Sequence, residues 1–374
     1  MSNNRARHFL ALLGSIFFIF ACASSCCESQ KRRTLASFKK GTKQVPYDRE
    51  TEPYTPIVDS HVHFRPFGGK EIPFNKLVNT IKSNGVRFVN VYGIGQRVDI
   101  DSNCIYYLDC PGTSVLPSTK NDMANAESYI QEQPEGIHLT VSMTFPDLAN
   151  PEHIFEIMQF YEQEYRGVFK WMGEVNLVKQ ALLANHHEPA DSTDIPNWSE
   201  FMAELRSKNM PINIHCDLGN DSSTYHYTKY LDLMKMTLET YPNNKIVWAH
   251  MGLSKELTQL DPDQHIQIMS GLLEKHANLI LDISWSVLEA NYFSKYREKY
   301  LAFVNAYPER FLPGTDFVAA ANKHTDQYKI DLDSTSLIHK GLSDEAFRNI
   351  VLGNNYFKLL DLDYEAPPIA QQTQ

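Results

Sequence analysis

The sequence has little positive charge. Its 374 residues contain 35 lysines and arginines against 45 aspartates and glutamates, which gives a formal net charge of −10. A general nucleic-acid binder needs a concentrated basic surface to hold the phosphate backbone. The densest basic run, residues 31–33 with Lys39 and Lys40, lies outside the region of regular hydrophobic patterning. The charge therefore argues against nucleic acid as a partner and makes a nuclease a weak alternative.

The N-terminal apolar run is too short for an ordinary membrane-spanning helix. It covers residues 9–23, a run of 15 residues, whereas a spanning helix needs about 20. Arg5 and Arg7 precede the run, and Cys22, Cys26 and Cys27 accompany small residues at its end. This order is typical of a secretory signal peptide, and the cysteines resemble the lipidation site of bacterial lipoproteins. We predict a lipoprotein-type signal peptide at 1–26, export to the periplasm or cell surface, and a lipid anchor; a short uncleaved anchor is the alternative.

Cysteine is scarce, with 6 in the whole chain. Export places the remaining cysteines in an oxidising compartment, where Cys104 and Cys110 are close enough in sequence to close a small disulfide loop. Cys216 follows an apolar segment and is more typical of a buried thiol. Residues 27–53 are rich in polar side chains and are predicted to be a tether, with a domain at 54–362 and a tail at 363–374.

The composition is globular, with 43% hydrophobic residues, 17 glycines and 19 prolines, which excludes fibrous and wholly disordered chains. From residue 55 onward, short apolar segments alternate with helical patterns, as in a (β/α)₈ TIM barrel of the α/β class. No Gly-x-Gly-x-x-Gly follows the first segment, which disfavours the nucleotide-binding form of a doubly wound sheet. The predicted strands are 56–64, 86–94, 137–145, 168–175, 211–217, 245–251, 279–284 and 310–317. The predicted helices cover 77–81, 154–161, 201–205, 231–238, 266–276, 296–307 and 344–360.

Histidine and aspartate stand at the ends of four predicted strands. His61 and His63 alternate in the first strand, so their side chains share a face. His215, His250 and Asp316 end the fifth, sixth and eighth strands. The carboxyl ends of barrel strands meet at one mouth, and an inward ring of such groups is costly to bury without a metal or hydrogen-bonding partners. These donors suit catalytic Zn²⁺, and Mn²⁺ or Fe²⁺ accept the same ligands.

The fourth predicted strand contributes two further candidates. Lys170 and Glu174 share one face with Met172 in a regular strand, so both side chains are expected at the barrel interior. Glu174 lies nearer the carboxyl end and is predicted as a metal ligand or a carboxylate beside the metal. Lys170 is predicted to contact substrate or, if carbamylated, to bridge two ions. The alternative is that both are ordinary ion-paired barrel residues.

The ordered set His61-x-His63, His215, His250 and Asp316 resembles the amidohydrolase superfamily of metal-dependent barrels. The segment 353–360, Gly-Asn-Asn-Tyr-Phe-Lys-Leu-Leu, is similar to the tail segment of the amidohydrolase-related branch. The resemblance implies one or two divalent ions held by His61, His63, Glu174, His215 and Asp316. It further implies that a metal-activated water attacks an amide, ester or lactone carbonyl, with Asp316 as the base and His250 polarising the carbonyl.

Two features beside the mouth complete the predicted site. The stretch 96–119 follows the second strand and is predicted to overhang the barrel mouth, with Tyr106 and Tyr107 as candidate substrate contacts. Arg65 follows His63 and is predicted to receive an anionic group of a small-molecule substrate; the alternative is a solvated loop arginine.

Two other functions stay open on the sequence. A non-hydrolytic decarboxylase of the same superfamily would use the same metal site. A surface-binding lipoprotein on an inactive barrel would differ in class, and it would be expected to lack at least one of the five ligand positions, all of which are filled here.

Overall fold

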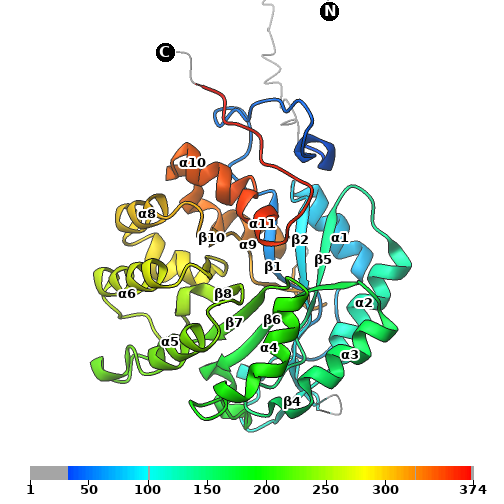
Figure 1. Cartoon of the computed structure of the whole chain (residues 1–374), viewed down its shortest axis with the longest axis vertical. Helices are drawn as coiled ribbons and strands as arrows, with labels where there is room; N and C mark the ends of the chain where they lie inside the picture. Colours follow the sequence, from blue (N-terminus) through cyan, green and yellow to red (C-terminus); the bar gives the residue numbers. More distant parts are fainter. Residues whose placement is uncertain (1–32, 100–101, 325, 372–374) are drawn as a thin grey trace, which may run out of the picture.

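The computed structural model describes residues 33–371, except 100, 101 and 325. In this part of the chain a curled parallel sheet is surrounded by helices (Figure 1), giving a TIM-barrel-like α/β fold. The strands are β1 Val58–His63, β2 Phe88–Tyr92, β3 Gln96–Val98, β4 Val115–Pro117, β5 His138–Met143, β6 Phe169–Val178, β7 Ile212–Cys216, β8 Ile246–Trp248, β9 Leu279–Asp282, β10 Phe311–Leu312 and β11 Phe317–Val318. The α-helices are α1 Phe74–Ser83, α2 Lys120–Glu132, α3 Ile154–Glu164, α4 Ser199–Ser207, α5 Leu231–Thr240, α6 Pro262–Lys275, α7 Ser286–Leu288, α8 Arg297–Ala306, α9 Gln327–Thr335, α10 Asp344–Ala346 and α11 Asn354–Leu359.

The sheet closes through a strand that is split in two. Its order is β10-β9-β8-β7-β6-β5-β2-β1-β11, and β10 and β11 are the two halves of the predicted eighth strand. β10 pairs with β9, and β11 pairs in parallel with β1. Gly314 lies between the halves, where a Cβ would come within 2.9 Å of Cβ of His61, so only glycine lets the chain pass this closely. Every predicted strand is therefore present in the sheet.

The strands form because their side chains are buried on both faces. All residues of β1, β2, β7 and β8 are buried, which explains their continuous apolar runs. Outside the sheet, α1 packs through Leu77, Val78 and Ile81, as its helical periodicity predicts. Inside the sheet, Phe88, Trp171 and other side chains fill the end opposite the mouth.

Residues 33–53 correct the prediction of a polar tether. The short 3₁₀ helix Leu35–Phe38 buries Phe38 completely, with its ring 5.8 Å from Phe88 and 6.3 Å from Phe357. Tyr47 is also buried, and its backbone pairs with the C-terminal tail. Figure 1 shows this segment and the tail side by side at one end of the molecule, with β4 at the other. The buried side chains of Phe38 and Tyr47 thus anchor this polar segment on the barrel.

The sequence patterns miss the helices α2 and α9, the three-residue helix α7 and a hairpin. Helix α2 buries Asn121, Asp122 and Asn125, so its inner face is polar and hydrophobic periodicity does not reveal it. Helix α9 buries only three of its residues and leaves Ile330 exposed. Strands β3 and β4 form an antiparallel hairpin within the stretch predicted to overhang the mouth.

The predicted signal peptide and its lipidation cysteines fall in residues 1–32, which lie outside the described residues. Within the described ranges, no helix is both long and apolar enough to span a bilayer.

Candidate metal site

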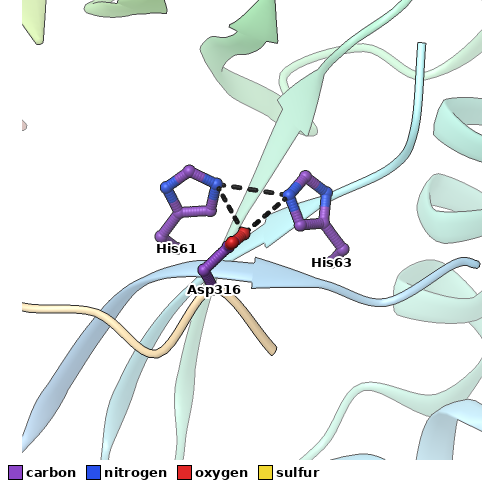
Figure 2. Close-up of side chains that lie close together, drawn as sticks. All are labelled: His61, His63 and Asp316. Atoms are coloured by element: carbon purple, nitrogen blue, oxygen red, sulfur yellow. Dashed lines mark hydrogen bonds and ion pairs between the residues drawn. The ribbon is translucent and has the colours of Figure 1, made fainter. Parts of the chain in front are cut away.

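Three ligand atoms, two from β1 and one from the loop before β11, converge at the mouth of the barrel. Nε2 of His61 lies 3.2 Å from Nε2 of His63, and Oδ1 of Asp316 lies 3.4 and 3.3 Å from these two nitrogens. Figure 2 shows the three side chains pointing at one another, both imidazoles from β1 and the carboxylate from the loop before β11. Asp59 fixes this loop, because its carboxylate accepts hydrogen bonds from the backbone N–H and the hydroxyl of Thr315.

The hydrogen bonds of both imidazoles leave Nε2 as a lone-pair donor. Nδ1 of His63 donates to the carbonyl of Gly93 at 2.7 Å, and Nδ1 of His61 donates to Oδ2 of Asp282 at 2.6 Å. Burial raises the pKa of Asp282, but His61, His250 and the Ser284 N–H outweigh burial and hold that pKa below its usual value. A neutral imidazole whose Nδ1 carries the proton presents the lone pair of Nε2. Both lone pairs thus face one point, as in metal-binding histidines oriented by a second hydrogen bond.

Glu174 lies beside this group and connects it to the other histidines. Its Oε2 lies 3.6 Å from Nε2 of His63, and its Oε1 lies 3.5 Å from Nε2 of His250. Lys179 donates to Oε2 at 2.9 Å. Burial raises the pKa of Glu174, but Lys179, His215 and hydrogen bonds from His215 and His250 hold it well below its usual range. Within the described ranges, ligand atoms cluster in two groups, His61–His63–Asp316 and His61–Glu174–His250.

His215 faces carboxylates rather than the convergence point. Its Nδ1 lies 2.5 Å from Oε1 of Glu174, and its Nε2 lies 2.9 Å from Oδ1 of Asp217. Burial and Lys179 lower its pKa, but the two carboxylates outweigh them and raise it to about 9. In this arrangement His215 is a cation between two anions with no free lone pair. Its role as a metal ligand stays a prediction.

Three residues around the mouth have backbone conformations that are uncommon outside glycine. The φ angles are 54° for His250, 80° for Trp285 and 56° for Asp316. Such conformations cost about 1–3 kcal/mol each and are concentrated at functional sites. They lie in the turns shortly after β8, β9 and β10, so these turns hold side chains at the mouth instead of letting them continue along the strands.

The donor set fits a divalent cation. Two imidazole nitrogens and a carboxylate oxygen are the ligands of catalytic zinc sites. The paired Nε2 lone pairs repel each other at 3.2 Å unless a proton or a cation lies between them. The carboxylates of Glu174, Asp282 and Asp316 also bring more negative charge to the buried site than Lys179 and His215 balance. A cation at the convergence point relieves both repulsions.

A cavity of about 420 Å³ opens onto the site. His215, His250 and Asp316 line it, and so do Tyr106 and Tyr107 of the overhanging loop. Cys104 and Cys110 form a disulfide that closes this loop, and all five residues between them line the cavity. The size suits a small molecule.

Lys170 and Arg65 do not reach the cavity, which corrects two predictions. Lys170 is exposed, because it is the extra residue of a bulge: Val141 pairs with Phe169, and the next residue, Ser142, pairs with Trp171. A second irregularity between Met172 and Val175 also breaks the alternation that had placed Lys170 on the face of Glu174. Neither substrate contact nor a carbamylated bridge is open to Lys170 there.

Arg65 is held by helix α2 instead. Its guanidinium donates to Oδ1 of Asn125, the carbonyl of Ala124, Oγ of Ser128 and Oε1 of Glu71. It lines a separate cavity of about 340 Å³. The polar face of α2, which hydrophobic periodicity does not show, thus occupies the side chain that was predicted to bind substrate.

Three charged residues of the site, Asp217, Asp282 and Lys179, were not among the predicted site residues. Asp282 ends β9, inside the predicted seventh strand, and Asp217 ends the predicted fifth strand, so the expectation that site residues lie at strand ends applies to them as it does to His250. Lys179 follows β6, beyond the predicted end of that strand, and carried no such signal.

Comparison with known proteins identifies a family. The family model described as amidohydrolase matches residues 162–355, which include Glu174, His215, His250 and Asp316. A solved dihydroorotase from Campylobacter jejuni is 14% identical, with a TM-score of 0.50 over 82% of this chain and 83% of that chain. An amidohydrolase from Burkholderia multivorans with bound zinc is 13% identical, with a TM-score of 0.52 over 82% of this chain and 99% of that one. No curated protein sequence matches this chain. The two structures share the fold.

Proposed function

Since the chain belongs to the amidohydrolase family, we propose that it is a metal-dependent hydrolase that cleaves an amide, ester or lactone of a small molecule. The observation that carries the proposal is the convergence of Nε2 of His61, Nε2 of His63 and Oδ1 of Asp316 on one point. This point adjoins a cavity of small-molecule size, and the residues present fit a divalent ion.

We assign His61, His63 and Asp316 to hold the ion, with Glu174 beside them. Zn²⁺ suits this donor set best, and Mn²⁺ or Fe²⁺ accept the same ligands. Bound there, a divalent ion would lower the pKa of water and polarise a carbonyl group.

Asp316 is suited to move the proton of the attacking water. It touches both imidazoles and also lines the cavity. Burial raises its pKa, but the neighbouring His63, His61 and His250 outweigh burial and hold that pKa well below its usual range. An ionised carboxylate at the cavity wall accepts a proton at its oxygen and then returns it to the leaving group.

His250 is suited to bind the carbonyl oxygen under attack. It lines the cavity, and its ring stacks on that of His61 with centroids 5.0 Å apart. Oγ of Ser284 lies 3.1 Å from its Nδ1, which fixes the ring. A donor on the side opposite the attacking water stabilises the charge that develops on the oxygen.

The test is metal analysis combined with a hydrolysis screen of esters, lactones and amides. We expect the purified protein to retain metal and to hydrolyse at least one class, and His61→Ala and Asp316→Asn to reduce the rate at least about 100-fold. His153→Ala and Asp232→Asn are matched controls, because these side chains are 77% and 92% exposed. Carbon dioxide release without hydrolysis would instead favour the decarboxylase. If the protein holds no metal and neither variant lowers any activity found, the proposal fails.

We also propose that the chain is exported and lipid-anchored. The proposal is supported by the order in which a charged, an apolar and a cysteine-containing segment follow one another in residues 1–27. Mass spectrometry of the protein from bacterial membranes would then find an acylated N-terminal cysteine, and Cys22→Ser and Cys26→Ser would identify which one. A soluble protein with an unmodified N-terminus would contradict it.

A further inference from the structure

Three lysines line the cavity, and their electrostatic surroundings differ. Nζ of Lys179 lies 2.9 Å from Oε2 of Glu174, and both side chains are buried. Its charge is therefore neutralised within the site. Lys255, which follows β8, and Lys323, which follows β11, lie at the carboxyl ends of their strands, where substrate enters a barrel of this kind.

Lys255 and Lys323 have no acidic partner at ion-pairing distance within the described ranges, and neither ammonium group donates a hydrogen bond there. Both are placed against aromatic rings instead. Nζ of Lys255 lies 6.0 Å from the ring centre of Tyr106 and 5.7 Å from that of Trp285. Nζ of Lys323 lies 4.5 Å from the ring centre of Phe317. The rings position the two cations but leave their N–H groups free to bind an anion.

The two cations also act on each other. Burial lowers the pKa of Lys323 most, and the charge of Lys255 lowers it further, while Asp331 and Asp316 raise it. Asp331 is itself engaged, since its Oδ1 accepts a hydrogen bond from Gln327 at 2.9 Å. Asp109 and Glu256 also line the cavity, but neither pairs with either lysine. An anion that binds both ammonium groups would offset the repulsion between these two like charges.

We infer that Lys255 and Lys323 form an anion-binding subsite at the mouth of the cavity. The substrate then carries a carboxylate or a phosphate group in addition to the bond that is cleaved. Tyr106 and Trp285, which flank Lys255, provide apolar walls for the carbon skeleton between the anionic group and the reacting carbonyl. The identification of the bound anion as part of a substrate rests on the proposed hydrolase function. The binding of an anion by the two lysines does not depend on that function.

The test is titration calorimetry with three probes that share one ring: benzoate, phenyl phosphate and neutral benzamide. We expect at least one of the two anions to bind more tightly than benzamide, and the tighter anion identifies the preferred group. The double variant Lys255→Gln/Lys323→Gln should bind that anion about tenfold or more weakly than the wild type, and its affinity for benzamide should change by less than about twofold. Lys229→Gln is the matched control, because its ammonium also lies over a ring, at 4.9 Å from Tyr230, but does not line the cavity.

Circular dichroism and thermal unfolding of the double variant check its folding. Because Lys255 is exposed and Lys323 half-buried, we expect both to match the wild type, and the single variants serve if the double variant unfolds. The subsite is refuted if benzamide binds as tightly as both anions, if neither anion binds, or if a folded variant keeps its anion affinity. These outcomes are independent of turnover. If the double variant loses anion binding but the wild-type protein hydrolyses nothing, the subsite is supported and the hydrolase function is rejected. If the wild-type protein is a hydrolase but the double variant keeps its anion affinity, the hydrolase function is supported and the subsite is rejected.

Discussion

Replacing Asp282 by asparagine should weaken metal binding without removing a ligand. Oδ2 of Asp282 lies 2.6 Å from Nδ1 of His61, and both side chains are fully buried. The carboxylate keeps the proton on Nδ1 and makes Nε2 a stronger electron-pair donor. Loss of such a partner costs about 10–100-fold in metal affinity, which corresponds to about 1.4–2.7 kcal/mol.

Competition against a zinc-binding indicator measures this loss directly. Asp122→Asn is the matched control, because Asp122 is also a fully buried carboxylate but accepts hydrogen bonds from the backbone N–H groups of Thr144 and Phe145, outside the site. We expect its zinc affinity to equal that of the wild type. An Asp282→Asn protein that folds and binds zinc as tightly as the wild type would refute the assignment of His61 as a ligand.

The same assay decides the role of His215. Asp217 accepts from Nε2 of His215 at 2.9 Å, so Asp217→Asn perturbs that ring as Asp282→Asn perturbs His61. If His215 remains a cation between carboxylates, we expect less than about a twofold change in zinc affinity. A loss comparable to that of Asp282→Asn would show that His215 turns to the ion when one is bound.

Three further predictions concern the scaffold around the site. Burial lowers the pKa of His339 to about 4, so its stabilising contribution is present above pH 6.5 and is lost, by about 3 kcal/mol, as the pH falls through 4. In the variant His339→Gln the free energy of unfolding should therefore fall less between pH 6.5 and pH 4, and a pH profile equal to that of the wild type would contradict this. Phe38→Ala should cost about 3–5 kcal/mol of stability in urea unfolding, whereas a flexible tether predicts no change. Cys104→Ser/Cys110→Ser should raise KM more than it lowers kcat, because the disulfide loop forms one cavity wall; equal kinetics would assign the disulfide to stability alone.

The strands and the strand-end residues were predictable because they depend on local patterns. Eight buried strands read as apolar runs, and the barrel then brings His61, His63, His250 and Asp316 to one mouth whatever the loops do. That these four residues lie near one another follows from the barrel topology alone. The distances among their ligand atoms did not, since they depend on the positive φ angles of His250 and Asp316, which no apolar pattern encodes.

The errors came from features that interrupt regular patterns. Lys170 was placed inside by strict alternation, and a bulge puts it outside. Arg65 was assigned to substrate because the polar inner face of α2 was not recognised. The polar composition of residues 33–53 hid the burial of Phe38 and Tyr47. In each case a few side chains outweigh the average character of the segment.

The proposed function depends on a divalent ion that binds between His61, His63 and Asp316. Its most direct test is anomalous diffraction at the zinc edge from crystals grown with zinc. We expect an anomalous peak about 2.0–2.2 Å from Nε2 of His61, Nε2 of His63 and a carboxylate oxygen of Asp316. A map with no peak at that point, or with zinc only at surface histidines such as His153, would contradict it.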